Sequence, residues 1–196
     1  MDNQVKSKRF TVYDLVIVGV TAAIIFALTY LVRIEIPTPL GPTNLKLANA
    51  FILIFAMLFG GLRGGLAGGI GSMIFDLLNP AYVASAPFTL VFFFLMGFVC
   101  GIISRIGKTK GHQMLWNIIG GIAGSLTYFV LHIGKSLIES LLLGNAFIVA
   151  LIDCSTKMIT SGINAVIAVV ISVLLVQVLS PVMARSGIFD KLGRVQ

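Results

Sequence analysis

The fold is decided by residues 46–103, which read KLANAFILIFAMLFGGLRGGLAGGIGSMIFDLLNPAYVASAPFTLVFFFLMGFVCGII. Apolar runs fill this stretch, and its charged side chains are limited to Lys46, Arg63 and Asp76. A transmembrane helix needs roughly 20 predominantly apolar residues to cross the hydrocarbon core. We therefore expect membrane spans at residues 47–61, which is short, and then at 64–78 and 88–104.

The rest of the chain has the same character. Of its 196 residues, 58% are hydrophobic and only 11% are charged, which is far from the usual balance of a soluble domain. We expect three further spans, at residues 15–32, 115–137 and 151–183. The prediction is an all-α membrane protein, a bundle of six transmembrane helices that forms one domain over residues 1–196.

The basic residues predict the orientation of this bundle. Ten of the 14 lysines and arginines fall on one side if there are six spans: Lys6, Lys8, Arg9, Arg63, Arg105, Lys108, Lys110, Arg185, Lys191 and Arg194. The positive-inside rule places that side, and therefore both termini, in the cytoplasm. The net charge of +7 is accounted for by this arrangement, and no nucleic-acid partner is predicted.

Residues 60–71, GGLRGGLAGGIG, contain seven glycines. Two stripes at four-residue spacing result, one of Gly60, Gly64 and Gly68 and one of Gly61, Gly65 and Gly69. Such stripes let membrane helices approach closely, whereas in water each glycine would weaken a helix by roughly 1 kcal/mol. We expect close helix packing here, with a tight turn at Arg63.

Motifs for nucleotide or metal chemistry are weak. Residues 101–109, GIISRIGKT, have five residues where the phosphate loop G-x4-G-K-[ST] requires four. His112 and His132 each lack a second ligand at the spacing of a metal site. No metal or cofactor is predicted.

Two alternatives to a binding protein stay open at this point. His132, Lys135 and Glu139 share one helical face, where they form either the outer mouth of the bundle or a catalytic relay. The relay would fit a membrane enzyme acting on a lipid or isoprenoid. A stand-alone secondary transporter is the other alternative, although the sequence shows no inverted repeat.

Polar residues gather at the ends of the spans that are assigned to the outside. Ionisable residues inside a membrane are costly and mark functional hypotheses. Asp153 and Lys157, four residues apart, either form an ion pair or line a ligand pocket with Asn164. A concave, mostly apolar site with a few polar groups suits a small molecule. The candidate substrate-binding residues are Asn44, Lys46, Asn49, Phe88, Phe92, Tyr128, His132, Asp153, Lys157 and Asn164.

Residues 46–103 resemble the substrate-binding S component of an energy-coupling factor (ECF) vitamin transporter. The most specific parts are the glycine-rich turn into Asp76 and the block APFT at residues 86–89. The proline-rich loop after the first span and the six-span count agree with this family. The resemblance implies a multi-pass protein of the prokaryotic plasma membrane that binds a vitamin or precursor outside, under that loop.

The resemblance also implies partners. A transmembrane scaffold (T) subunit and two ATP-binding cassette subunits would hydrolyse ATP, so the chain itself would be no enzyme, and it would topple in the membrane to release its cargo. Gly19, Ala23 and Ala27 form a small-residue stripe that either packs internally or docks a partner helix, and the resemblance favours docking.

One departure from the family pattern bears on the cargo. Similar sequences often carry a lysine shortly after the APFT block and a glutamate three residues later, where this chain has Phe93 and Met96. This span therefore forms a more apolar wall, which suits a planar, largely neutral cargo. Riboflavin, pyridoxine, a pyrimidine-type heterocycle and other vitamins are the candidates.

Overall fold

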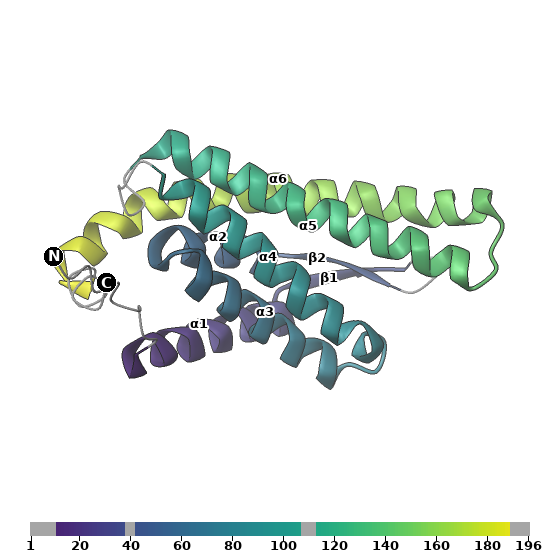
Figure 1. Cartoon of the computed structure of the whole chain (residues 1–196), viewed down its shortest axis with the longest axis horizontal. Coiled ribbons are helices and arrows are strands. Elements are labelled where there is room, and N and C mark those ends of the chain that lie inside the picture. The colour runs from purple at the N-terminus through teal and green to yellow at the C-terminus, as the bar shows by residue number, and fades with distance from the viewer. Residues whose placement is uncertain (1–10, 38–41, 107–112, 189–196) are drawn as a thin grey trace, which may run out of the picture.

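The computed structural model describes residues 11–37, 42–106 and 113–188, with every side chain in them except that of Asp153. This described part contains six α-helices, one 3-10 helix and a two-stranded sheet (Figure 1). In chain order they are α1 (Val12–Leu31), β1 (Arg33–Ile36), β2 (Thr43–Lys46), α2 (Ala48–Phe59), α3 (Gly61–Leu78), η1 (Val83–Ser85), α4 (Ala86–Ser104), α5 (Met114–Leu142) and α6 (Phe147–Arg185). A helix occupies each predicted span.

Four helical segments of the described chain are long and apolar enough to cross a membrane, namely α1, α5, α6 and the segment Val83–Ser104 that contains α4. By contrast, α2 has only 12 residues, and α3 carries Arg63 and Asp76. The structure thus confirms a helical protein with several membrane-spanning helices. The count of six spans and the cytoplasmic termini stay predictions, although α1 begins and α6 ends at the same end of the molecule (Figure 1).

Three of the ten basic residues used for the orientation are described, namely Arg63, Arg105 and Arg185. The others lie outside the described residues, as does His112: Lys6, Lys8, Arg9, Lys108, Lys110, Lys191 and Arg194. Arg63 pairs with Asp14 near the start of α1, and Arg185 lies in the last turn of α6. Both therefore lie at the end where α1 begins.

The loop after α1 contains a β-hairpin, which departs from the all-α prediction. Its strands are antiparallel, with Arg33 opposite Lys46 and Ile36 opposite Thr43. Pro37 follows β1 and Pro42 precedes β2, so both prolines lie just outside the hydrogen-bonded ladder, where proline is tolerated. The prolines exclude a helix here but permit extended strands.

The glycine stripes pack as predicted. A Cβ atom at Gly68 would lie 2.7 Å from the side chain of Ile52 on α2, and one at Gly65 would lie 2.6 Å from the carbonyl oxygen of Phe94 on α4. One stripe therefore faces α2 and the other faces α4. Because both contacts exclude a methyl group, α3 packs closely against two helices at once.

The turn between α2 and α3 lies at Gly60, so the prediction of a turn at Arg63 was wrong. Gly60 has φ of 95°, a conformation that glycine adopts without steric cost. Arg63 lies instead in the first turn of α3 and donates to the carbonyl oxygen of Phe59 at 3.1 Å, while Arg105 donates to that of Leu58 at 2.8 Å. The two cations satisfy carbonyl groups at the C-terminal end of α2.

The start of α1 is joined to α3 by an ion pair. Thr11 and Asp14 form a capping box, and Oδ1 of Asp14 accepts a hydrogen bond from Nε of Arg63 at 2.6 Å. Both side chains are largely buried. This pair fixes one end of α1 against the rest of the bundle.

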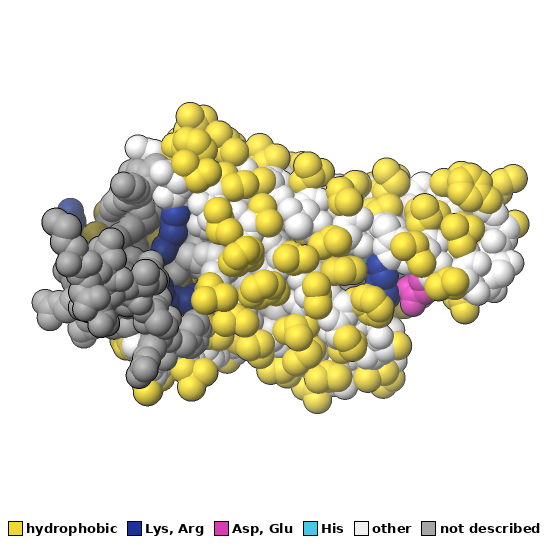
Figure 2. Space-filling view, viewed as in Figure 1, with side chains coloured by type: hydrophobic (Ala, Val, Ile, Leu, Met, Phe, Trp, Pro, Cys, Tyr) yellow, Lys and Arg dark blue, Asp and Glu magenta, His cyan; other side chains and the backbone are white. Residues whose placement is uncertain are grey.

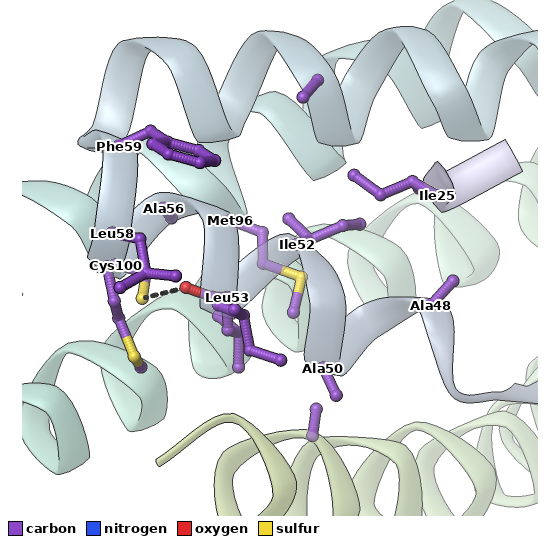
Figure 3. Packing of buried hydrophobic residues seen from close by; sticks show 14 of the residues in the cluster. Ile25, Ala48, Ala50, Ile52, Leu53, Ala56, Leu58, Phe59, Met96 and Cys100 are labelled. Atoms are coloured by element: carbon purple, nitrogen blue, oxygen red, sulfur yellow. Dashed lines mark hydrogen bonds between the residues drawn. The ribbon is translucent and has the colours of Figure 1, made fainter. Parts of the chain in front are cut away.

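The core surrounds α2 (Figure 3). Ile52, Leu53 and Met57 of α2 are fully buried, and Ile25 of α1 and Met96 of α4 belong to the same cluster. The outward faces of the long helices instead carry exposed apolar side chains, and apolar side chains cover most of the visible surface (Figure 2). Such an apolar exterior is expected of a protein surrounded by lipid.

The last two helices are longer than predicted. The spans were predicted at residues 115–137 and 151–183, whereas α5 continues to Leu142 and α6 runs from Phe147 to Arg185 with Pro181 inside it. Membrane helices tolerate proline when neighbouring groups satisfy the freed backbone. At about 1.5 Å per residue, the 39 residues of α6 exceed the hydrocarbon thickness of about 30 Å. Accordingly, α5 and α6 project beyond the other helices (Figure 1).

Candidate ligand-binding site

A cavity of about 220 Å³ lies at the end of the bundle away from the start of α1. The hairpin, the end of α3, the start of α4 and the facing parts of α5 and α6 surround it. Its lining consists of Pro42, Thr43, Asn44, Lys46, Asp76, Ala81, Tyr82, Ala84, Ser85, Phe88, Thr89, Phe92, Phe93, Tyr128, His132, Lys135, Ser136, Glu139, Lys157, Ser161 and Asn164. Polar and aromatic groups from distant parts of the sequence thus converge on one cavity.

The structure brings eight of the ten candidate residues to this cavity: Asn44, Lys46, Phe88, Phe92, Tyr128, His132, Lys157 and Asn164. Asn49 does not line it, because the first turn of α2 is already inside the core, where Asn49 is 2% exposed. The side chain of Asp153 lies outside the described residues, so its ion pair with Lys157 stays a prediction. The binding role of all ten residues also stays a prediction.

Asn164 joins the hairpin to α6. Its Nδ2 donates to the backbone carbonyl of Asn44 at 2.7 Å, and its Oδ1 accepts from the backbone N–H of Lys46 at 2.9 Å. Within the described chain, the Oδ1 atom of Asn44 is buried and lacks a hydrogen-bond partner. Since an unsatisfied buried acceptor costs about 1–3 kcal/mol, a ligand donor reaching this oxygen would bind favourably.

A column of stacked rings forms one wall of the cavity. The rings of Phe93 and Tyr128 are stacked with centroids 4.5 Å apart, and Tyr128 stacks in turn on His132 at 5.3 Å. Tyr128 and His132 are four residues apart on α5 and therefore share one face. Nζ of Lys46 lies 4.6 Å from the Phe93 ring centroid, a cation–π geometry. The apolar residue at position 93 thus completes a column of aromatic rings along this wall.

The hairpin brings Lys46 to the cavity and is held there by a hydrogen bond between Glu35 and Tyr82. Desolvation by the surrounding protein lowers the pKa of the Lys46 amine, and the nearby Asp76 carboxylate offsets part of this effect. Tyr82 lies in the turn after α3, and its hydroxyl donates to Oε1 of Glu35 at 2.8 Å. Burial and this hydrogen bond raise the pKa of Tyr82, so the phenol stays protonated and holds β1 against the α3–η1 connection.

The predicted face of His132, Lys135 and Glu139 lies along the cavity, but its members have different partners. Nζ of Lys135 is 2.9 Å from Oε2 of Glu139 and donates to Oγ of Ser85 at 2.9 Å. His132 stacks on Tyr128, and its Nδ1 is 3.3 Å from Oγ of Ser161. Lys135 therefore joins α5 to η1, while His132 belongs to the aromatic wall.

Several lining residues were missed as binding candidates. Ser136 lies one turn beyond His132, and Ser161 lies one turn beyond Lys157; Nζ of Lys157 donates to Oγ of Ser136 at 2.7 Å. Extending each predicted face by four residues would have found both serines. The sequence singled out Asp76 only as a charged residue and as part of the family resemblance, and its place in the lining depends on how α3 packs.

These features define a helical membrane protein with a polar and aromatic cavity near one end, as expected of a solute-binding subunit. A family model described as the ECF-type riboflavin transporter, S component, matches residues 9–181. The chain belongs to this family, which confirms the resemblance found in the sequence. It is therefore a substrate-binding subunit of an ECF vitamin transporter, and proteins of this kind are not enzymes.

The fold agrees with a solved structure of the same class. The chain superimposes with a TM-score of 0.61 on a structure described as "Structure and mechanism of the S component of a bacterial ECF transporter". The match covers 87% of this chain and 97% of that chain at 21% sequence identity. A comparison with curated proteins gives no significant match. At this identity the likeness shows a shared fold.

Proposed function

We propose that the chain captures a planar heterocyclic vitamin outside the cell and that riboflavin is the first candidate. The aromatic column of Phe93, Tyr128 and His132 is the observation that carries this proposal, because these rings line the cavity and a heterocycle can pack against their edges in the edge-to-face geometry that aromatic rings favour. Amide, hydroxyl and charged groups around it can meet the polar edges of such a ring. The description of the matched family as riboflavin transporters supports the same candidate.

Binding to the purified chain tests this proposal. The tagged protein is extracted in mild detergent, its co-purifying small molecules are identified by mass spectrometry, and riboflavin, pyridoxine and a pyrimidine-type precursor are titrated by calorimetry. We expect one planar heterocycle to bind tightly. If no heterocycle co-purifies and none of the three binds, the proposal is wrong.

Tyr128→Leu should weaken this binding by up to about tenfold, because an edge-to-face aromatic contact contributes about 0.5–1.5 kcal/mol. Phe129→Leu is the matched control, since Phe129 is the next residue of α5 but lines a different, apolar groove with α6. Calorimetric titration of both variants checks the prediction. Equal losses in the two variants would show that the Tyr128 ring makes no specific contact with the ligand.

We also propose that the chain, as a single multi-pass unit of the prokaryotic plasma membrane, works with a T subunit and two ATP-binding cassette subunits, and that it topples to deliver its cargo inside. The α1 stripe supports the docking part of this proposal. Gly19 and Ala23 are exposed and Ala27 is half-buried, and a Cβ atom at Gly19 would meet no atom within 4 Å. A partner helix could approach the α1 backbone closely along this open stripe.

Ala23→Leu should reduce recovery of the T and ATPase subunits in a mild-detergent pull-down from the native host, because the larger side chain holds a partner helix away. Ligand affinity should be unchanged, since Ala23 is absent from the cavity lining. Ile24→Leu, a size-conserving change on the same helix, is the control. Recovery equal to wild type would contradict docking at this stripe, and absence of ATPase subunits from the wild-type pull-down would contradict the importer role.

A further inference from the structure

A groove between α4 and α5 shares a wall with the ligand cavity. It has a volume of about 580 Å³ and is lined almost entirely by apolar side chains, which come from the start of α4, from α5 between Val130 and Leu142, and from Leu143 just after α5. Four residues line both the groove and the cavity, namely Phe88, Phe92, Lys135 and Glu139. Whatever fills the groove therefore touches the back of the cavity wall.

The groove lies on the outer surface of two helices that can cross a membrane, so lipid is the molecule expected to cover it. Both α5 and the segment containing α4 are long and apolar enough to cross a membrane, and the groove residues Val130 and Leu142 are 60% and 82% exposed. Figure 2 shows this face covered with apolar side chains, among which a basic and an acidic group lie side by side toward the end that α5 and α6 extend. Lipid chains, not water, are the solvent for such a surface.

The charged pair at the groove suits a lipid headgroup. The side chains of Lys135 and Glu139 form an ion pair at 2.9 Å and are 18% and 54% exposed. A zwitterionic phospholipid presents a phosphate and an ammonium group close together, so its headgroup carries a charge opposite to each member of this pair. The apolar groove beside the pair can then hold an acyl chain.

We propose that this groove binds one acyl chain of a zwitterionic phospholipid whose headgroup lies over Lys135 and Glu139. The bound acyl chain packs against Phe88 and Phe92 on the side away from the cavity and so holds this part of the cavity wall in place. Lipid and vitamin therefore strengthen each other's binding. Such coupling must be reciprocal. The coupling rests on the proposed function of the cavity, whereas the lipid site itself does not.

Two glycines provide a matched pair of substitutions. Gly134 lines the groove, and a Cβ atom there would meet nothing within 4 Å. Gly134→Leu should therefore fill the groove without disturbing the helices. Gly162 of α6 has equally open space and is absent from the groove lining, so Gly162→Leu is the control.

Fluorescence quenching can detect the acyl chain directly. Trp116, the single tryptophan, is replaced by phenylalanine, and a reporter is introduced by Val130→Trp in the groove or by Val91→Trp outside it. Val91 is also exposed. Val91 and Val130 lie at a similar depth in the membrane. The helices α4 and α5 are antiparallel, with Gly124 against Met96 and Gly120 against Ser104, and this register places residue 130 near the level of residue 91. Each protein is studied in detergent micelles that contain a low ratio of phosphatidylcholine brominated on its acyl chains.

We expect stronger quenching from position 130 than from position 91. Gly134→Leu should abolish the difference, and Gly162→Leu should preserve it. Equal quenching at the two positions, or a difference that survives Gly134→Leu, would overturn the lipid site.

Riboflavin titrations with and without phosphatidylcholine then test the coupling. We expect lipid to tighten riboflavin binding by about fivefold in the parent protein and to have no effect in Gly134→Leu. Equal affinity with and without lipid, in a protein whose groove shows quenching, would overturn the coupling. If riboflavin does not bind under any condition, the proposed cargo fails while the quenching result still stands.

Discussion

Asn164→Leu is expected to lower the affinity of the chain for its vitamin by about tenfold to a hundredfold. Its amide makes two hydrogen bonds that join β2 to α6, to Asn44 at 2.7 Å and to Lys46 at 2.9 Å. Leucine has a similar size but leaves a buried carbonyl and N–H unpaired, at a cost of about 1–3 kcal/mol. The free protein can escape this cost by moving the hairpin away from α6, whereas the closed, ligand-bound form pays it, and each 1.4 kcal/mol corresponds to a tenfold change in affinity. The hairpin should then no longer hold the Lys46 amine over the Phe93 ring.

A second buried asparagine separates this effect from a general loss of stability. Asn117 of α5 is fully buried and is absent from the cavity lining. We expect Asn117→Leu and Asn164→Leu both to lower the thermal stability of the protein in detergent, but only Asn164→Leu to weaken binding in calorimetry. We call the two hydrogen bonds of Asn164 to the hairpin the clamp. If Asn164→Leu binds the vitamin as tightly as wild type, the clamp does not shape the site.

Helical periodicity predicts the position of Asn164 in the site but not its contacts with the hairpin. Lys157 and Asn164 were predicted to share one face of the last helix, and both line the cavity, because helical periodicity is a local property. The clamp itself joins residues 118 and 120 positions apart in the chain. Periodicity carries no information about such pairs, so the role of Asn164 in holding the hairpin was beyond sequence reasoning.

The turn at Gly60 and the burial of Asn49 were also beyond sequence reasoning, each for a physical reason. The glycine stripes were recognised because their spacing repeats, but any of several glycines could have formed the turn, and only the backbone shows that Gly60 has positive φ. Asn49 looked like a mouth residue because it is polar and follows the loop. It is buried instead, because α2 is too short to span a membrane alone and enters the core within its first turn.

Gly65→Ala should cause the largest loss of stability among the substitutions considered. The new Cβ atom would lie 2.6 Å from the carbonyl oxygen of Phe94, and a Cβ atom at the facing Gly97 would lie 2.8 Å from the Gly65 Cα atom. These obstacles are backbone atoms, which cannot rotate away as a side chain can. Relief therefore requires α3 and α4 to separate, at a cost of about 1–3 kcal/mol or more.

Gly162→Ala is the control for this prediction. It adds the same methyl group to a helix where nothing lies within 4 Å, so it should stabilise the protein by up to about 1 kcal/mol through helix propensity alone. Thermal unfolding in detergent should thus move in opposite directions for the two variants. Because Phe93 lies one turn from Gly97 on α4, separation of α3 and α4 should also displace the aromatic wall and weaken vitamin binding. A Gly65→Ala protein as stable as the control would mean that the α3–α4 contact is not closely packed and cannot be what positions the wall.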